Sequence, residues 1–233
     1  MIVMPANSTG WWTHIMARET GRLGHLYSPG AQRSPKPWLP YALDNGAFAC
    51  WDPDDNTFDA AKWEGVERAW HRLIVWAQCQ NQKPMWTVVP DVPGNAEATA
   101  HCWYQYAPAL THFPRALAVQ DGMTAETVRR LAPAPDVIAV GGSTEWKWAT
   151  VAMWAAEFPR VHLLRCNSPK RLYELEALGV ESCDGTGWGR GNRTQHEGLE
   201  TWARQPDRIK PHTAPIADHM CRDSKDKNQG SFI

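Results

Sequence analysis

Short apolar runs recur between Ile2 and Asp184, and between them lie segments whose apolar residues have the spacing of an amphipathic helix. This alternation is the feature of the sequence that most constrains the fold. The runs are Ile2–Met4, Tyr41–Leu43, Met85–Val89, Ala116–Val119, Asp136–Val140, Val161–Leu164 and the residues that lead to Asp184. Apolar strands that alternate with helices predict an α/β protein with a parallel sheet. The regular spacing, together with the lack of a glycine-rich dinucleotide fingerprint, favours a (β/α)₈ TIM barrel over an open doubly wound sheet. The pattern does not locate the eighth strand.

Helix start signals follow several of these runs. Asp59, Asn95, Thr124 and Ser168 each precede an apolar helical pattern and can cap it. Gly179 follows the helical segment from Pro169 to Leu178 and suits a left-handed C-cap.

The remaining segments give weaker signals. Thr194 and Glu197 have the spacing of a capping box for a last helix. The stretch 18–40 is rich in Arg, Gly and Pro and is interpreted as a long surface loop.

Length and composition indicate one domain. We expect a barrel domain over residues 1–205, small for its class and with room for irregularity, and a polar tail over 206–233 that is partly disordered. The formal net charge of -1 provides no global attraction to nucleic acid, so such binding would need local basic patches. Six cysteines without C-x-x-C spacing, no signal-like start and no apolar run of membrane-spanning length predict a cytoplasmic protein without a membrane partner.

Polar residues follow the predicted strands one after another. Because all βα loops of a barrel open on one face, we expect these residues to meet in one pocket despite their separation in sequence. Carboxylates can accept N–H bonds from a guanine edge, while an amide and glycine N–H groups can donate to a carbonyl oxygen. Two further carboxylates suit covalent and proton-transfer chemistry at an anomeric carbon. The residues are Asp44, Asp91, Gln120, Gly141, Gly142, Asn167 and Asp184.

The order of the strand-end motifs resembles that of a known superfamily. The motifs are Leu43-Asp44-Asn45-Gly46-Ala47-Phe48, Pro90-Asp91-Val92, Val119-Gln120-Asp121-Gly122, Gly141-Gly142 and Cys183-Asp184. Together they cover roughly residues 40 to 190 and resemble the tRNA-guanine transglycosylases. They are more similar to the phage and bacterial DNA 7-deazaguanine transglycosylases of the DpdA type.

The resemblance implies a role for each matched residue. Asp184 would be the nucleophile that attacks C1′, and Asp44 would handle the proton of the leaving or arriving base. Asp91 and Gln120 would read the guanine edge, with Gly141 and Gly142 as backbone donors to the base carbonyl. Phe48, Trp188 and Trp11 are candidates for stacking on the base, and Asn167 is a further substrate-binding candidate.

Departures from the family pattern favour DNA over tRNA as the partner. The tRNA enzymes hold zinc with C-x-C-x-x-C and a later His after the nucleophile, and no such spacing occurs here. We therefore expect no metal and no other cofactor. Phosphate contacts would come from Arg190, Arg193, Lys170 and Arg171.

The implied activity is exchange of guanine in DNA for a 7-deazaguanine base, in the host cytoplasm if the protein is phage-encoded. The cyano, aminomethyl and formamidino forms of that base stay open. Three alternatives also stay open, namely a tRNA substrate, a barrel N-glycoside hydrolase and a non-catalytic DNA-binding module.

Overall fold

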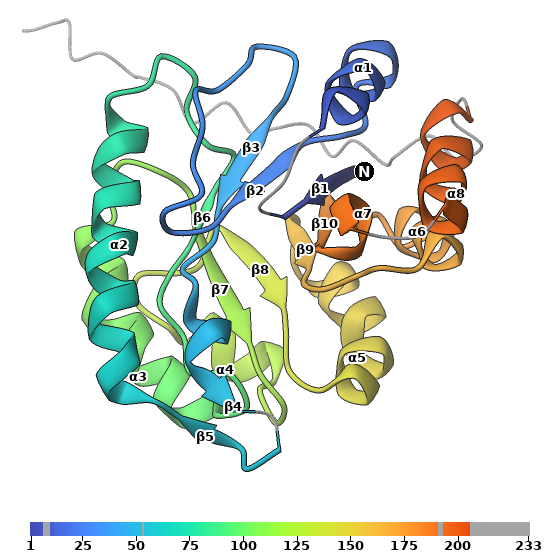
Figure 1. The fold of residues 1–233 in the computed structure, drawn as a ribbon. Helices are drawn as coiled ribbons and strands as arrows, with labels where there is room; N and C mark the ends of the chain where they lie inside the picture. Colours follow the sequence, from blue (N-terminus) through green and yellow to red (C-terminus); the bar gives the residue numbers. More distant parts are fainter. Residues whose placement is uncertain (7–9, 53, 191–192, 206–233) are drawn as a thin grey trace, which may run out of the picture.

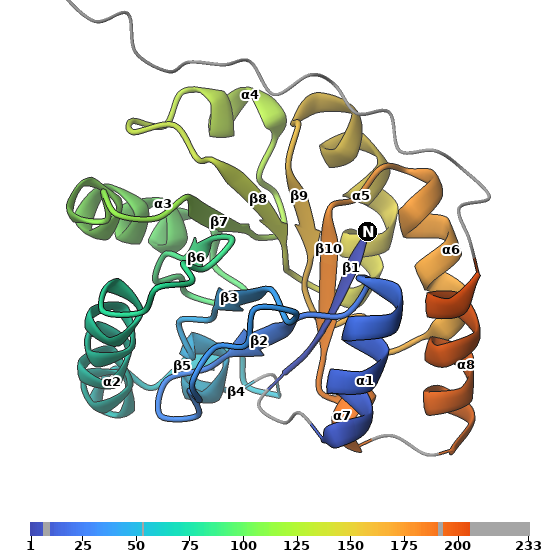
Figure 2. The ribbon, with the colours of Figure 1, turned by 90° about the horizontal axis from the view of Figure 1, so that it is seen from above.

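The computed structural model describes residues 1–6, 10–52, 54–190 and 193–205 of the chain. Eight parallel strands form the main sheet in the order β1-β10-β9-β8-β7-β6-β3-β2, with helices around it (Figures 1 and 2). The strands are β1 Ile2–Pro5, β2 His25–Tyr27, β3 Tyr41–Leu43, β6 Thr87–Val88, β7 Arg115–Val119, β8 Val137–Val140, β9 Val161–Leu163 and β10 Ser182–Gly185. The predicted (β/α)₈ fold class is confirmed, and all seven predicted strands are present.

The eighth strand is β2, and it brings the two ends of the sheet together. Parallel bridges join Val3 to Leu23 and Ala6 to Leu26, so the sheet is a nearly closed barrel. Gly24 donates its N–H to the carbonyl of Val3 at 2.9 Å. A side chain at this glycine would approach the Pro40 carbonyl to 2.7 Å, so the close contact between strands requires glycine here.

The prediction of one long surface loop over residues 18–40 is therefore wrong for β2. All three residues of this strand are buried, and the strand pairs in register with β3, His25 opposite Tyr41 and Tyr27 opposite Leu43. Its sequence is too short to show alternation, so its strand conformation is fixed by its neighbours on both sides. The barrel is also irregular here, because residues 28–40 form no helix between β2 and β3.

Helices follow most strands and cover the outside of the barrel. They are α1 Trp11–Thr20, α2 Ala60–Gln78, α3 Ala96–Tyr106, α4 Ala125–Arg129, α5 Thr144–Glu157, α6 Pro169–Ala177, α7 Gly187–Arg190 and α8 Arg193–Arg204, with 3₁₀ turns η1 Ala47–Cys50 and η2 Ala107–Ala109. A small antiparallel hairpin, β4 Trp51–Asp52 and β5 Thr57–Phe58, precedes α2. The sequence analysis predicted neither α1 nor this hairpin.

The structure confirms a side-chain N-cap at three of the predicted helices. The side chains of Asp59, Asn95 and Thr124 accept N–H groups of α2, α3 and α4 respectively. Gly179 has φ +77°, as expected after α6. The capping box expected at Thr194 is wrong because α8 already includes Arg193, which places Thr194 inside the helix.

Alanines from several strands line the barrel interior, together with Met4, Leu26 and Val88. Side chains alternate along each strand, so Ala116 and Ala118 of β7 face inward while Leu117 and Val119 pack against the outer helices. The large aromatic of the inner cluster is Trp86, which is fully buried. The small side chains around it leave space toward the carboxyl ends of the strands.

The described residues up to 205 belong to the barrel and its helices, and the predicted tail over 206–233 lies outside them. Among the described helices, none combines the length and the apolar character needed to cross a membrane.

Candidate active site

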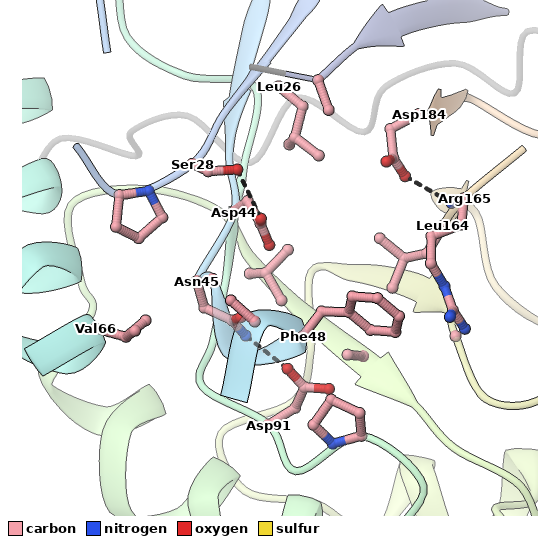
Figure 3. A pocket seen from close by; sticks show the side chains of 18 of the residues that line it. Leu26, Ser28, Asp44, Asn45, Phe48, Val66, Asp91, Leu164, Arg165 and Asp184 are labelled. Carbon is pink, nitrogen blue, oxygen red and sulfur yellow. Dashed lines mark hydrogen bonds between the residues drawn. The ribbon is translucent and has the colours of Figure 1, made fainter. Parts of the chain in front are cut away.

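A pocket of about 610 Å³ opens at the carboxyl ends of the strands (Figure 3). This volume lies within the usual range for small-molecule sites. Every predicted catalytic and substrate-binding residue lines it, and no tryptophan does. Those residues are Asp44, Phe48, Asp91, Gln120, Gly141, Gly142, Asn167 and Asp184. The expectation that the strand ends converge is confirmed.

Asp184 lies in β10 and is held through one carboxylate oxygen. Its Oδ1 accepts the backbone N–H of Arg165 at 3.0 Å and lies 3.1 Å from Nε2 of His162. Its other oxygen has no hydrogen bond from the described residues, and Figure 3 shows it pointing to the side of the pocket where Asp44 lies. The carboxylate is therefore fixed at one oxygen and open at the other.

Asp44 follows β3 and faces the same pocket. Its Oδ2 accepts the hydroxyl of Ser28 at 2.9 Å. Burial raises the pKa of Asp44, and the negative charge of Asp184 raises it further, against the opposing effect of the Ser28 bond. Asp44 thus retains its proton to a higher pH than an ordinary aspartate.

Asp91 follows β6 and is clamped between two amides. Its Oδ1 accepts Nδ2 of Asn45 at 2.7 Å, and its Oδ2 accepts Nε2 of Gln120 at 2.8 Å. The Gln120 oxygen accepts the N–H of Gly94 at 3.1 Å, which fixes the orientation of this amide. Burial raises the pKa of Asp91 to about 7, although the Asn45 bond opposes the change.

The two glycines after β8 differ in what they can offer a ligand. The N–H of Gly141 donates to the Val119 carbonyl at 3.0 Å, so it is already used in a hydrogen bond between neighbouring strands of the barrel. The N–H of Gly142 makes no hydrogen bond with the described residues. Of the two predicted backbone donors, only Gly142 can therefore donate to a base.

Arg165 also lines the pocket and was not predicted. Its φ of +59° is rare for a residue with a side chain, and the buried Lys147 of α5 donates Nζ to its carbonyl at 3.3 Å. Its guanidinium donates to the Gly142 carbonyl at 2.6 Å and lies 4.6 Å from the centre of the Phe48 ring. The only sequence signal for it is its place directly after a strand.

Comparison with known proteins adds no family. No protein-family model and no curated protein matches this chain. The function is therefore argued from the geometry of the pocket and from the motif order described above.

Of the three aromatic stacking candidates, only Phe48 is in place. It is 49 % exposed and lines the pocket. Trp188 is wrong because its ring is buried and packs in the hydrophobic core. Trp11 is 78 % exposed at the start of α1 and is not among the residues that line the pocket, so its role stays a prediction.

Asn167 has a structural partner. Its Oδ1 accepts the N–H of Gly187 at 2.8 Å, and a side chain at Gly185 or Gly187 would collide with it. Asn167 therefore holds the loop behind Asp184.

The four predicted phosphate contacts come after β9 and β10 in the sequence. Arg171 is paired with Glu174 and lies 4.5 Å from the Trp148 ring centre, and Arg193 is paired with Glu197 at 2.5 Å. Lys170 is exposed, and the side chain of Arg190 lies outside the described part of the chain. No group of three or more His, Cys, Asp or Glu side chains in the described residues is arranged to hold a metal ion.

The arrangement combines three carboxylates and one guanidinium at one opening. Asp44 and Asp91 are desolvated, and Asp184 is held by donors at one oxygen. Carboxyl groups in such different environments can divide the roles of acid and nucleophile at neutral pH.

Proposed function

We propose that the protein is a DNA-guanine transglycosylase that exchanges guanine for a 7-deazaguanine base. The observation that carries the proposal is that Asp44 and Asp184, 140 positions apart, line one pocket together with Asp91 and Gln120. The motif order described above supports the same activity.

The exchange proceeds in two displacements at C1′. In the first, the carboxylate of Asp184 attacks C1′ of the nucleotide and the C1′–N9 bond breaks. The electron pair of the broken bond goes to the leaving guanine, which takes the proton of Asp44. In the second, the 7-deazaguanine gives its N9 proton to Asp44 and attacks C1′, which releases Asp184.

Asp91 and Gln120 account for recognition of the base. Each Asp91 oxygen accepts one amide and retains a lone pair for the N1–H and N2–H groups of a guanine edge. The N–H of Gly142 can donate to the O6 carbonyl. Phe48 provides the apolar face against which the purine ring stacks.

A guanine in duplex DNA must leave the stack to reach C1′, at a cost of a few kcal/mol. Burial of the purine in the pocket and stacking on Phe48 offset this cost. Lys170 and Arg171, which follow β9, are the proposed contacts to the flanking phosphates.

The test is incubation of duplex DNA with labelled 7-cyano-7-deazaguanine, followed by nucleoside analysis by mass spectrometry and by denaturing gels for a covalent adduct. We expect incorporation and a DNA adduct that both disappear in Asp184→Ala. Asp44→Asn should lower turnover more than DNA binding. Asp136→Asn is the matched control because Asp136 pairs with Arg115 just before β8, at the opposite end of the barrel.

The outcomes separate the alternatives. Abasic sites without incorporation would indicate an N-glycoside hydrolase. Incorporation into tRNA but not DNA would indicate the tRNA activity, and binding without any base release would indicate a non-catalytic module. An adduct that persists in Asp184→Ala would remove this residue from the proposed role.

A further inference from the structure

The inner face of the barrel holds a polar chain that leads to Asp184. His162 of β9 is completely buried; its Nδ1 lies 2.8 Å from the hydroxyl of Ser182, and its Nε2 lies 3.1 Å from Oδ1 of Asp184. Its ring packs against Trp86 at 4.5 Å between centroids. A polar ring in a fully buried position is costly unless both nitrogens are satisfied, and here both are.

The two partners determine which nitrogen of His162 carries the proton. The carboxylate of Asp184 can only accept, so Nε2 must donate to it. Nδ1 of the neutral ring then accepts, and the hydroxyl of Ser182 donates to it. Ser182 and Asp184 are two residues apart in β10, so both side chains point into the barrel toward the same ring.

We propose that His162 is a positioning residue that, together with the N–H of Arg165, holds Oδ1 of Asp184 so that Oδ2 is the nucleophilic oxygen. This inference rests on the proposed function for its catalytic meaning. Two donors converge on Oδ1, at 3.1 Å and 3.0 Å, and the described residues leave Oδ2 without a donor. A carboxylate held at one oxygen has one orientation for attack, which avoids the reorientation that a free side chain requires.

Other groups interact with Asp184 electrostatically, namely Asp44 from β3, Lys147 from α5, Arg165 after β9 and the thiols of Cys166 and Cys183. A substitution at His162 or Ser182 removes none of these side chains, so the variants test the hydrogen bonds of the histidine itself.

The experiment compares His162→Leu, His162→Gln and Ser182→Ala. Glutamine can place a side-chain N–H near the position of Nε2, whereas leucine cannot donate. His25→Gln is the matched control, because His25 is a buried histidine of strand β2 whose ring nitrogens make no hydrogen bond with the described residues.

For DNA exchange we expect His162→Leu to lower kcat at least 10-fold with little change in KM. His162→Gln should recover most of the lost kcat. A wild-type kcat in His162→Leu, or equal losses in the leucine and glutamine variants, would overturn the proposal.

A second measurement does not depend on a folded leucine variant. It uses the rate of adduct formation in Ser182→Ala, which removes the hydroxyl that fixes the ring of His162. We expect this variant to form the adduct more slowly than wild type and faster than Asp184→Ala. An adduct formed at the wild-type rate in Ser182→Ala would overturn the positioning role, whereas no adduct and no base exchange in the wild-type protein would instead overturn the proposed function.

Discussion

The burial of Asp91 predicts a pH-dependent stability that Asp91→Asn should remove. Burial raises the pKa of Asp91 from 3.8 to about 7 in the folded protein. Between these two values the folded state binds one more proton at this site than the unfolded state does. The stabilisation is therefore complete below pH 3.8 and is lost as the pH rises through 7. A displacement of this size corresponds to about 4 kcal/mol in the free energy of unfolding.

Asparagine has nearly the same shape but does not ionise. One clamp donor, from Asn45 or Gln120, would then face an amide NH₂ instead of an oxygen, which costs about 1–3 kcal/mol at every pH. We therefore expect Asp91→Asn to be less stable than wild type at pH 4 and as stable or more stable at pH 8.5. The difference between the two proteins should change by about 1.4 kcal/mol per pH unit between about pH 4 and pH 7, and should level off above the folded pKa of Asp91.

Urea unfolding followed by tryptophan fluorescence at pH values from 4 to 9 measures this difference directly. Asp136→Asn, at the opposite end of the barrel, controls for loss of one carboxylate from the surface. Asp44 stays in both proteins, so its own titration largely cancels in the comparison. Parallel curves for wild type and Asp91→Asn across this range would refute the assignment of a buried, protonated Asp91.

Two further substitutions test the pocket walls. Gly142→Ala should lower the melting temperature by about 2–10 °C in calorimetry. The backbone of Gly142 has φ +72°, and the new Cβ would lie 2.1 Å from Oδ1 of Asp121. An unchanged melting temperature would contradict this strained geometry. Phe48→Ala should raise KM for the 7-deazaguanine base roughly 10-fold through lost stacking, with unchanged unfolding in urea. Trp11→Ala, which removes an exposed ring that is not among the pocket-lining residues, is its control, and equal effects of the two changes would exclude stacking on Phe48.

The pocket could be predicted from sequence because its members occupy strand ends. Asp44, Asp91, Gln120 and Asp184 each come directly after or at the end of an apolar run, and a parallel barrel brings all strand ends to one face. The cap residue Asn95 was similarly visible, since its side chain acts within its own segment. These features depend on local sequence and on one general rule of topology.

The features that sequence reasoning missed depend on partners far away in the chain. His25 to Tyr27 form a strand because β1 and β3 lie on both sides. Arg165 occupies a left-handed conformation that its own sequence disfavours, and the Lys147 ammonium and the Asp184 carboxylate hold it there. Trp188 follows Asp184 closely in sequence, yet its ring is buried in the hydrophobic core because it lies in α7.

His162 illustrates why such a partner is hard to identify before the fold is known. In the run Val161–Leu164 it reads as one polar residue in an apolar strand. Only the register of β9 beside β10, with His162 opposite Ser182, brings the ring within reach of Asp184. In a barrel the inward positions of neighbouring strands form layers. The layer beneath the pocket is therefore where residues that orient a strand-end nucleophile should be sought.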